Sequence, residues 1–297
     1  MNRDHAVFRT YSLLGRALGA LPEPVALAAA AVVGDALFEF RDGHRDMVSR
    51  NLRRVVGDVG DEALRRWAKR SFRAYARYWV EGARLGSTPR TEVLQRFVVD
   101  GFEHLEEGMA QGRGVVMALP HVGSWEYGGA FLSAVGYPMT AVAERLEPPE
   151  LFEYFVAQRA AMGLTIVPLG PHSMTEVMQA IRSGALVGLL SDRDLNDAGV
   201  EVDFFGERTT MPGGPATAAL RTGAVLLTGA VYSGPGRDHR AVINPPVDTA
   251  RQGSFRADVH RVTQCIATEF EGLIRRAPEQ WHVFQPLWPA DRVKADA

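Results

Sequence analysis

The chain has 297 residues, of which 46% are hydrophobic and 23% charged, as in an ordinary globular protein. This length suffices for one large α/β domain or two small ones. Its one cysteine, Cys265, excludes an internal disulfide and is expected as a small core residue in a reducing compartment. No signal peptide is expected, because Met1–His5 leads into a polar-interrupted helix and not into an apolar core with a cleavage site. No transmembrane helix is expected either, because the most apolar run, Val25 to Leu37, is shorter than the roughly 20 residues that a membrane span needs.

The net charge of −2 hides an asymmetry along the chain. Residues 1–90 hold 16 Lys and Arg against 10 Asp and Glu, whereas the remainder holds 17 against 25. A solvated helical surface and a face that meets anionic lipid both explain a basic N-terminal third.

The first 90 residues are predicted to be helical. An apolar stripe indicates a first amphipathic helix, formed by Phe8, Leu13, Leu14, Leu18 and Leu21. Pro22-Glu23-Pro24 turns the chain into a second apolar helix that ends near Phe40, and a long helix follows from Asp61 to about Arg84. The first two helices form a predicted hairpin, which either packs on the main core or serves as an interfacial membrane anchor.

After Thr88-Pro89, short apolar runs alternate with helical patterns. The predicted strands are Phe97–Val99, Val115–Leu119, Met139–Val142, Leu164–Val167, Leu186–Leu190, Val200–Phe204, Val225–Val231 and Ala241–Ile243. The helical patterns include Pro149–Met162, Ser173–Ser183, Gly214–Thr222 and Phe255–Ala277. The predicted class is therefore α/β, with a mostly parallel or mixed central sheet flanked by helices and an N-terminal helical hairpin. Residues 1–90 are predicted as a helical, membrane-associating region and residues 91–297 as the α/β core, joined in one continuous domain.

His121 is the first candidate for catalysis. It follows the buried strand Val115–Leu119, and Gly123-Ser124 then opens a helix that carries Glu126 in its first turn. Ligands of open α/β sheets bind at the carboxyl ends of strands. A neutral imidazole is suited to accept a proton from an attacking hydroxyl near pH 7, and a carboxylate on its other nitrogen fixes the tautomer. The pair can meet only if His121 lies in the loop, and a structural pair remains the alternative.

Two acid–arginine pairs, Glu144-Arg145 and Asp192-Arg193, also follow predicted strands. Arginine clamps phosphate and carboxylates accept hydrogen bonds from sugar hydroxyls, although any one such pair is more often structural. Their position at the same sheet edge as His121 favours a substrate site.

The string from His121 to Glu126 resembles the His-x4-Asp/Glu motif of the glycerolipid and lysophospholipid acyltransferase superfamily. Further segments resemble its bacterial branch of lipid A biosynthesis acyltransferases, namely Asn51–Arg54, Gly112–Val116, Asp203–Gly206 and Pro278–His282. Others are similar to the actinobacterial phosphatidylinositol mannoside acyltransferases, namely Val142–Leu146, Asp192–Leu195, Val202–Gly206, Met211-Pro212, Trp281-His282, Gln285-Pro286 and Trp288.

The resemblance implies transfer of a fatty acyl chain, usually palmitoyl, from acyl-CoA to a mannose hydroxyl of phosphatidylinositol mannoside. It implies a peripheral protein on the cytoplasmic face of the plasma membrane, with no metal, no organic cofactor and no nucleic-acid partner. By position, His121 would be the general base and Glu126 its partner, and Asp192 would sit beside the acceptor sugar. Arg145, Arg159 and Arg193 are the implied contacts for acceptor phosphate or for holding the site together.

Two positions depart from the pattern, since Glu126 stands where Asp is commoner and Asp192 stands where Glu is expected in the mannoside enzymes. Two alternatives therefore accompany the mannoside prediction. One is acyl transfer to a lipid A precursor or a lysophospholipid, and the other is a non-catalytic lipid-binding homologue.

Overall fold

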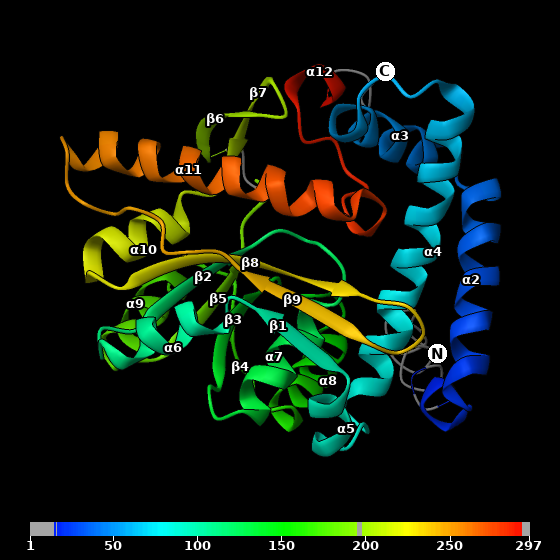
Figure 1. Cartoon of the computed structure of the whole chain (residues 1–297), viewed down its shortest axis with the longest axis horizontal. Helices are drawn as coiled ribbons and strands as arrows, with labels where there is room; N and C mark the ends of the chain where they lie inside the picture. Colours follow the sequence, from blue (N-terminus) through cyan, green and yellow to red (C-terminus); the bar gives the residue numbers. More distant parts are fainter. Residues whose placement is uncertain (1–14, 16, 195–197, 293–297) are drawn as a thin grey trace.

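A computed structural model describes residue 15 and residues 17–194 and 198–292 (Figure 1). The described helices are α2 (Glu23–Phe40), α3 (Asp42–Val56), α4 (Asp61–Leu85), α5 (Arg90–Gln95), α6 (Phe102–Ala110), α7 (Trp125–Ala134), α8 (Pro149–Ala161), α9 (Ser173–Arg182), α10 (Gly214–Thr222), α11 (Phe255–Arg276), the short η1 (Pro278–Gln280) and α12 (Pro289–Arg292). Most of the predicted first helix, residues 8–21, lies outside the described residues.

The strands are β1 (Phe97–Asp100), β2 (Val115–Leu119), β3 (Met139–Ala143), β4 (Thr165–Pro168), β5 (Leu186–Leu190), β6 (Val200–Phe204), β7 (Glu207–Met211), β8 (Val225–Ser233) and β9 (His239–Ile243). Seven of them form one sheet in the order β1-β9-β8-β2-β5-β3-β4. All neighbours pair in parallel except β8 with β9, so β1 and β9 run opposite to the other five strands. The predicted α/β class with a mostly parallel sheet is confirmed.

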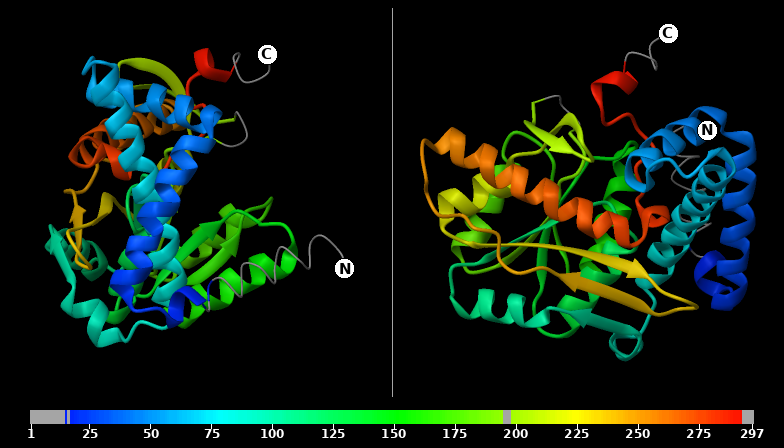
Figure 2. Two further views of the ribbon diagram at one scale, coloured as in Figure 1. Left: turned by 90° about the vertical axis from the view of Figure 1, so that its right-hand side faces the viewer. Right: turned by 45° about the horizontal axis from the view of Figure 1, so that its top comes forward.

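Helices cover both faces of this sheet (Figures 1 and 2). Along β2, Val116 and Ala118 face a core shared with α9, α10 and α11, whereas Val115 and Met117 face one shared with α6 and α7. Because both faces of β2 are buried, its sequence is a continuous apolar run rather than an alternating one.

One predicted strand lies elsewhere than expected. The segment Val200–Phe204 pairs with β7 in a separate two-stranded hairpin, and not with the central sheet. Phe205 and Gly206 connect the two strands with φ angles of 51° and 78°, the backbone of a type I′ turn. The strand β7 was missed because Glu-Arg-Thr-Thr-Met carries almost no apolar pattern.

Helices α2 and α4 pack side by side at one edge of the molecule (Figure 1). Small residues permit this close approach. A Cβ on Gly34 of α2 would lie 2.7 Å from the Cα of Arg73 in α4, so only glycine fits there. Next to Arg73 in the middle of α4, Phe72 contacts Phe284 with ring centroids 5.0 Å apart, which joins the N-terminal helices to the C-terminal segment.

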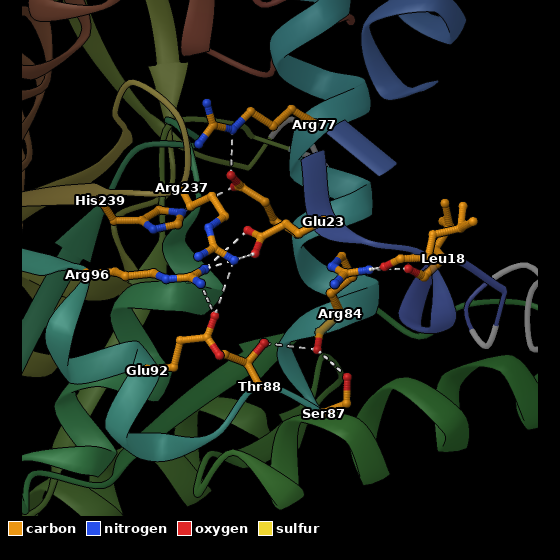
Figure 3. A network of polar contacts seen from close by, with 12 residues as sticks. Leu18, Glu23, Arg77, Arg84, Ser87, Thr88, Glu92, Arg96, Arg237 and His239 are labelled. Carbon is orange, nitrogen blue, oxygen red and sulfur yellow. Dashed lines mark hydrogen bonds and ion pairs between the residues drawn. The ribbon is translucent and has the colours of Figure 1, made fainter. Parts of the chain in front are cut away.

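A cluster of charged side chains fixes the start of α2 on the α/β core (Figure 3). Glu23 accepts hydrogen bonds from Arg96 at 3.0 and 3.2 Å and from Arg237 at 2.7 Å. Arg84 of α4 donates to the carbonyl oxygens of Leu18 and Leu21 just before α2. The position of α2 is therefore set by polar contacts to α4, α5 and the loop before β9.

Glu81 makes a second, buried link between α4 and the sheet. Its carboxylate lies 2.5 Å from Arg77 and 3.3 Å from His239 at the start of β9, and it accepts a hydrogen bond from Ser233 at 3.0 Å. Burial by itself would raise the pKa of Glu81, but its interactions with His239 and Arg77 outweigh that effect and hold it at about 2. Glu81 is therefore ionised at neutral pH and holds α4 against the end of the sheet.

Candidate active site

His121 and Asp192 stand at equivalent places on two neighbouring strands. Leu119 at the end of β2 is in register with Leu190 at the end of β5, and the Ser191 amide donates to the Leu119 carbonyl at 3.0 Å. His121 and Asp192 each follow two positions after these paired residues. Parallel pairing thus brings the two side chains together at the carboxyl edge of the sheet.

The loop after His121 returns the chain to the sheet before α7 begins. Gly123 adopts a φ of 57°, and a Cβ there would lie 2.1 Å from the Val231 carbonyl oxygen. The amide of Gly123 donates to Gln280 and that of Ser124 donates to Val231. The glycine therefore allows the loop to cross to β8 before α7 begins, which keeps His121 outside the helix as the sequence predicts.

Asp192 is the carboxylate that pairs with His121. Its Oδ1 is hydrogen-bonded to Nδ1 of the imidazole, and its Oδ2 accepts from the His121 backbone amide at 3.0 Å and from Trp281 Nε1 at 2.8 Å. Burial alone would raise the pKa of Asp192, but two effects outweigh it and lower the pKa to about 2: the positive charge that His121 carries when it is protonated, and the hydrogen bonds from His121 and the Trp281 indole. An ionised, fully buried carboxylate with three donors orients the imidazole rigidly.

Arg193 occupies the other side of the imidazole. Its Nη2 lies 2.8 Å from His121 Nε2, and its Nη1 donates to Gln285 Oε1 at 3.1 Å. Because a guanidinium only donates, Nε2 must present its lone pair, and the proton on the ring must sit on Nδ1 beside Asp192. His121 is therefore held as the neutral tautomer that a general base requires.

The sequence predicts Glu126 as the partner of His121, but the structure does not bring the two side chains together. Oε1 of Glu126 accepts from Arg159 of α8 at 2.9 and 2.6 Å, while both imidazole nitrogens of His121 are taken by Asp192 and Arg193. The first turn of α7 aims Glu126 toward α4 and α8, so that its Oε2 lies close to Gly82. The two predicted residues share the motif but not a hydrogen bond.

The assignment of Asp192 beside an acceptor sugar also needs correction. Asp192 is 1% exposed, and both of its carboxylate oxygens are hydrogen-bonded within the protein, so the side chain is not accessible to a sugar hydroxyl. Glu144 and Arg145 follow β3, on the far side of β5, and both are exposed. Arg145 stacks on Phe152 at 6.0 Å, so these two side chains are open to a ligand rather than joined to each other.

Aromatic side chains surround His121, and sequence reasoning did not assign them roles. Trp125 meets the imidazole edge-on at 5.4 Å and contacts Tyr78 of α4 at 4.3 Å. The ring of His282 lies 6.0 Å from that of Trp125. Burial, and after it repulsion from His121 when that imidazole is protonated, lowers the pKa of His282 to about 3. His282 is therefore neutral at physiological pH.

Sequence spacing offered no route to Tyr78 or Trp281, which come from α4 and from the segment after η1. Trp281 forms a single β-bridge with Val122, which places its indole against Asp192. Among the residues that the structure describes, no group of three His, Cys, Asp or Glu side chains is arranged to hold a metal ion. The arrangement is that of an imidazole hydrogen-bonded to a buried carboxylate, the pair that accepts a proton in Ser-His-Asp enzymes.

Comparison with known proteins agrees with this arrangement. The family described as bacterial lipid A biosynthesis acyltransferase matches residues 5–290. The phosphatidylinositol mannoside acyltransferase of Mycolicibacterium smegmatis is 37% identical over 95% of this chain and 91% of its own length, and that of Mycobacterium tuberculosis H37Rv is 37% identical over 93% and 86%. The lipid A biosynthesis palmitoleoyltransferase of Escherichia coli K12 is 25% identical over 92% and 86%. The chain therefore belongs to the bacterial lipid A biosynthesis acyltransferase family and is an acyltransferase.

Proposed function

We propose that this acyltransferase moves a fatty acyl chain, palmitoyl in the first instance, from acyl-CoA to a mannose hydroxyl of phosphatidylinositol mannoside. The observation that carries the proposal is the imidazole of His121, held between the buried carboxylate of Asp192 and an arginine, with no protein nucleophile needed. The names of the two mycobacterial relatives support the acceptor.

In this mechanism the acceptor hydroxyl attacks the thioester carbonyl carbon while Nε2 of His121 takes its proton. The Asp192 carboxylate stabilises the imidazolium that forms. When the tetrahedral intermediate collapses, the carbon–sulfur bond breaks and the imidazolium returns the proton to the departing thiolate. The products are the acyl ester and CoA, and His121 is again neutral. The chemistry requires neither a metal nor an organic cofactor.

Arginines at the same edge are suited to the phosphate groups of both substrates. Arg145 is exposed after β3, and Arg159 carries its charge beside Glu126 in a partly exposed ion pair. We assign Glu144, Arg145, Arg159 and Arg193 to substrate contact, since guanidinium groups bind phosphate in two-pronged hydrogen bonds and a free carboxylate accepts from sugar hydroxyls. Glu126 is assigned to positioning Arg159.

The proposal is tested by incubating the protein with radiolabelled palmitoyl-CoA and three acceptors in parallel. These are phosphatidylinositol mannoside, a tetra-acylated lipid A precursor and lysophosphatidylcholine. We expect label in the mannoside at a rate at least about tenfold above the other two, the factor that corresponds to one hydrogen bond to a charged group. Preferential labelling of either other acceptor would contradict the mannoside assignment, and binding of palmitoyl-CoA without any transfer would favour a non-catalytic lipid-binding protein.

The exposed face of α2 supports contact with a membrane surface. Val25, Val32, Val33 and Phe40 are 52%, 70%, 52% and 85% exposed, and their spacing places them along one side of the helix. Exposed arginines of α4 flank this helix and are suited to anionic headgroups. Within the described part of the chain, no helix has the length and apolarity that crossing a membrane demands. We therefore propose peripheral binding to the cytoplasmic face through α2.

We expect Val32→Asp combined with Phe40→Asp to weaken binding to phosphatidylglycerol vesicles about 30-fold, because two apolar side chains worth about 1 kcal/mol each no longer enter the interface. Vesicle co-sedimentation measures this loss. Val98→Asp is the matched control, since Val98 is a 57% exposed valine on the edge strand β1. Equal binding by the double variant and the parent protein would refute α2 as the contact.

A further inference from the structure

The guanidinium of Arg193 covers the atom of His121 that the reaction needs free. Nδ1 of His121 faces the buried Asp192, so only Nε2 can take a proton from a substrate. Arg193 Nη2 lies 2.8 Å from that nitrogen. Since an imidazole nitrogen has one in-plane lone pair, Nε2 cannot accept from Arg193 and from a hydroxyl at once. Arg193 must leave before the acceptor can be deprotonated.

The hydrogen bonds that hold Arg193 in this place are few. In the described part of the chain, its hydrogen-bond partners are the imidazole of His121 and the side-chain amide of Gln285, both neutral. Its Nε is buried and has no hydrogen-bond partner. A guanidinium with an unsatisfied buried nitrogen and neutral partners gains by moving to an anion, and a phosphate oxygen pair matches its geometry best.

We propose that Arg193 is a substrate-displaced cap on the catalytic base. In this proposal, which rests on the function proposed above, the phosphate of the acceptor lipid draws the guanidinium off His121 and so frees Nε2 only when an acceptor is present. Arg193 is then a positioning residue with two states. It fixes the tautomer of His121 in the free enzyme and contacts the acceptor in the complex.

The cap protects the acyl donor from water. With Nε2 free and no acceptor bound, a water oxygen can attack the thioester carbon while His121 takes its proton. Collapse then breaks the carbon–sulfur bond and returns the proton to sulfur, which yields fatty acid and CoA. A covered Nε2 blocks this hydrolysis. The CoA phosphates are a second source of an anion that could displace Arg193. The rate of hydrolysis without acceptor distinguishes the two sources, because only CoA phosphates are present then.

A chemical label tests the cap without any enzymatic turnover. Diethylpyrocarbonate reacts with the free lone pair of a neutral imidazole, and peptide mass spectrometry reports its rate at His121. We expect Arg193→Gln to label about fivefold faster than the parent protein, the factor that corresponds to loss of one hydrogen bond. Gln285→Leu, which keeps the guanidinium but removes its second partner, should give a smaller increase. Arg193→Lys keeps a cationic N–H donor for Nε2 and should restore slow labelling.

Arg113→Gln is the matched control, because Arg113 is exposed and donates to the Gly223 carbonyl, away from His121. Labelling of Arg193→Gln and Gln285→Leu at the parent rate would overturn the cap even if acyl transfer proceeds as proposed. Faster labelling in a protein that transfers no acyl chain would instead support the cap and refute the proposed function.

The rates of thioester hydrolysis and of acyl transfer test whether the cap protects palmitoyl-CoA from water. Without acceptor, we expect Arg193→Gln to hydrolyse the thioester about fivefold faster than the parent protein, while its transfer to phosphatidylinositol mannoside falls. Equal hydrolysis by the two proteins would overturn the acceptor-driven cap, because it would mean that donor phosphates already displace Arg193 or that Arg193 does not exclude water.

Discussion

Replacing His121 by alanine is expected to lower acyl transfer by a factor of about 10³ or more while the fold is retained. The substitution removes the imidazole that we propose as the general base, and general base catalysis contributes about 10² to 10⁴ in rate. His282 cannot substitute, since it is buried and its pKa is lowered to about 3. Initial rates with palmitoyl-CoA and phosphatidylinositol mannoside measure the loss.

The fold survives this change because Asp192 keeps two of its three donors. The backbone amide at position 121 and Trp281 Nε1 still reach Oδ2, so the buried carboxylate loses a single hydrogen bond. We expect a destabilisation of about 2 kcal/mol. His121→Gln is the companion variant, because its amide can donate to Asp192 but cannot accept a proton. Near-parental transfer by a folded His121→Ala protein would refute the base assignment.

Much of the fold followed from hydrophobic pattern alone. The strands β2, β5 and β6 begin and end where the sequence predicts. β2 and β5 are short apolar runs, and β6 alternates apolar with charged residues. The hairpin of β6 with β7 did not follow. Its pairing depends on a turn with positive φ at Phe205. Phenylalanine rarely adopts this conformation, so the residue pattern does not predict it.

The site was predictable in its location but not in its pairings. His121, Asp192 and Arg193 were all expected at strand ends. That β5 rather than β3 lies beside β2 is a property of strand order, and local spacing carries no information about it. Proximity in sequence therefore favoured Glu126, five residues away, over Asp192, 71 residues away and bonded through parallel pairing.

Replacing Asp192 by asparagine is expected to lower kcat by a factor of about 10⁴, as loss of the orienting carboxylate does in other imidazole bases. Oδ2 accepts from two N–H groups, so the asparagine oxygen must take that place and its amide nitrogen must face Nδ1. Nδ1 then has to accept, and the ring proton moves to Nε2. Nε2 then has no lone pair with which to take a proton, and its N–H faces the N–H donor of Arg193. Single-turnover kinetics measure the effect.

Glu126→Gln separates the two carboxylates. The substitution keeps the volume of the side chain and weakens its hold on Arg159, while His121 keeps both of its partners. We expect an effect of about tenfold, mainly on KM for the acceptor, the size of one charged hydrogen bond. Asp192→Glu retains the carboxylate and should recover part of the rate that Asp192→Asn loses. Two results together would contradict the assignment of Asp192 as the partner of the base: loss of turnover in Glu126→Gln, and a kcat within about tenfold of the parent enzyme in Asp192→Asn. Glu126 would then have to move from Arg159 to His121 during the reaction.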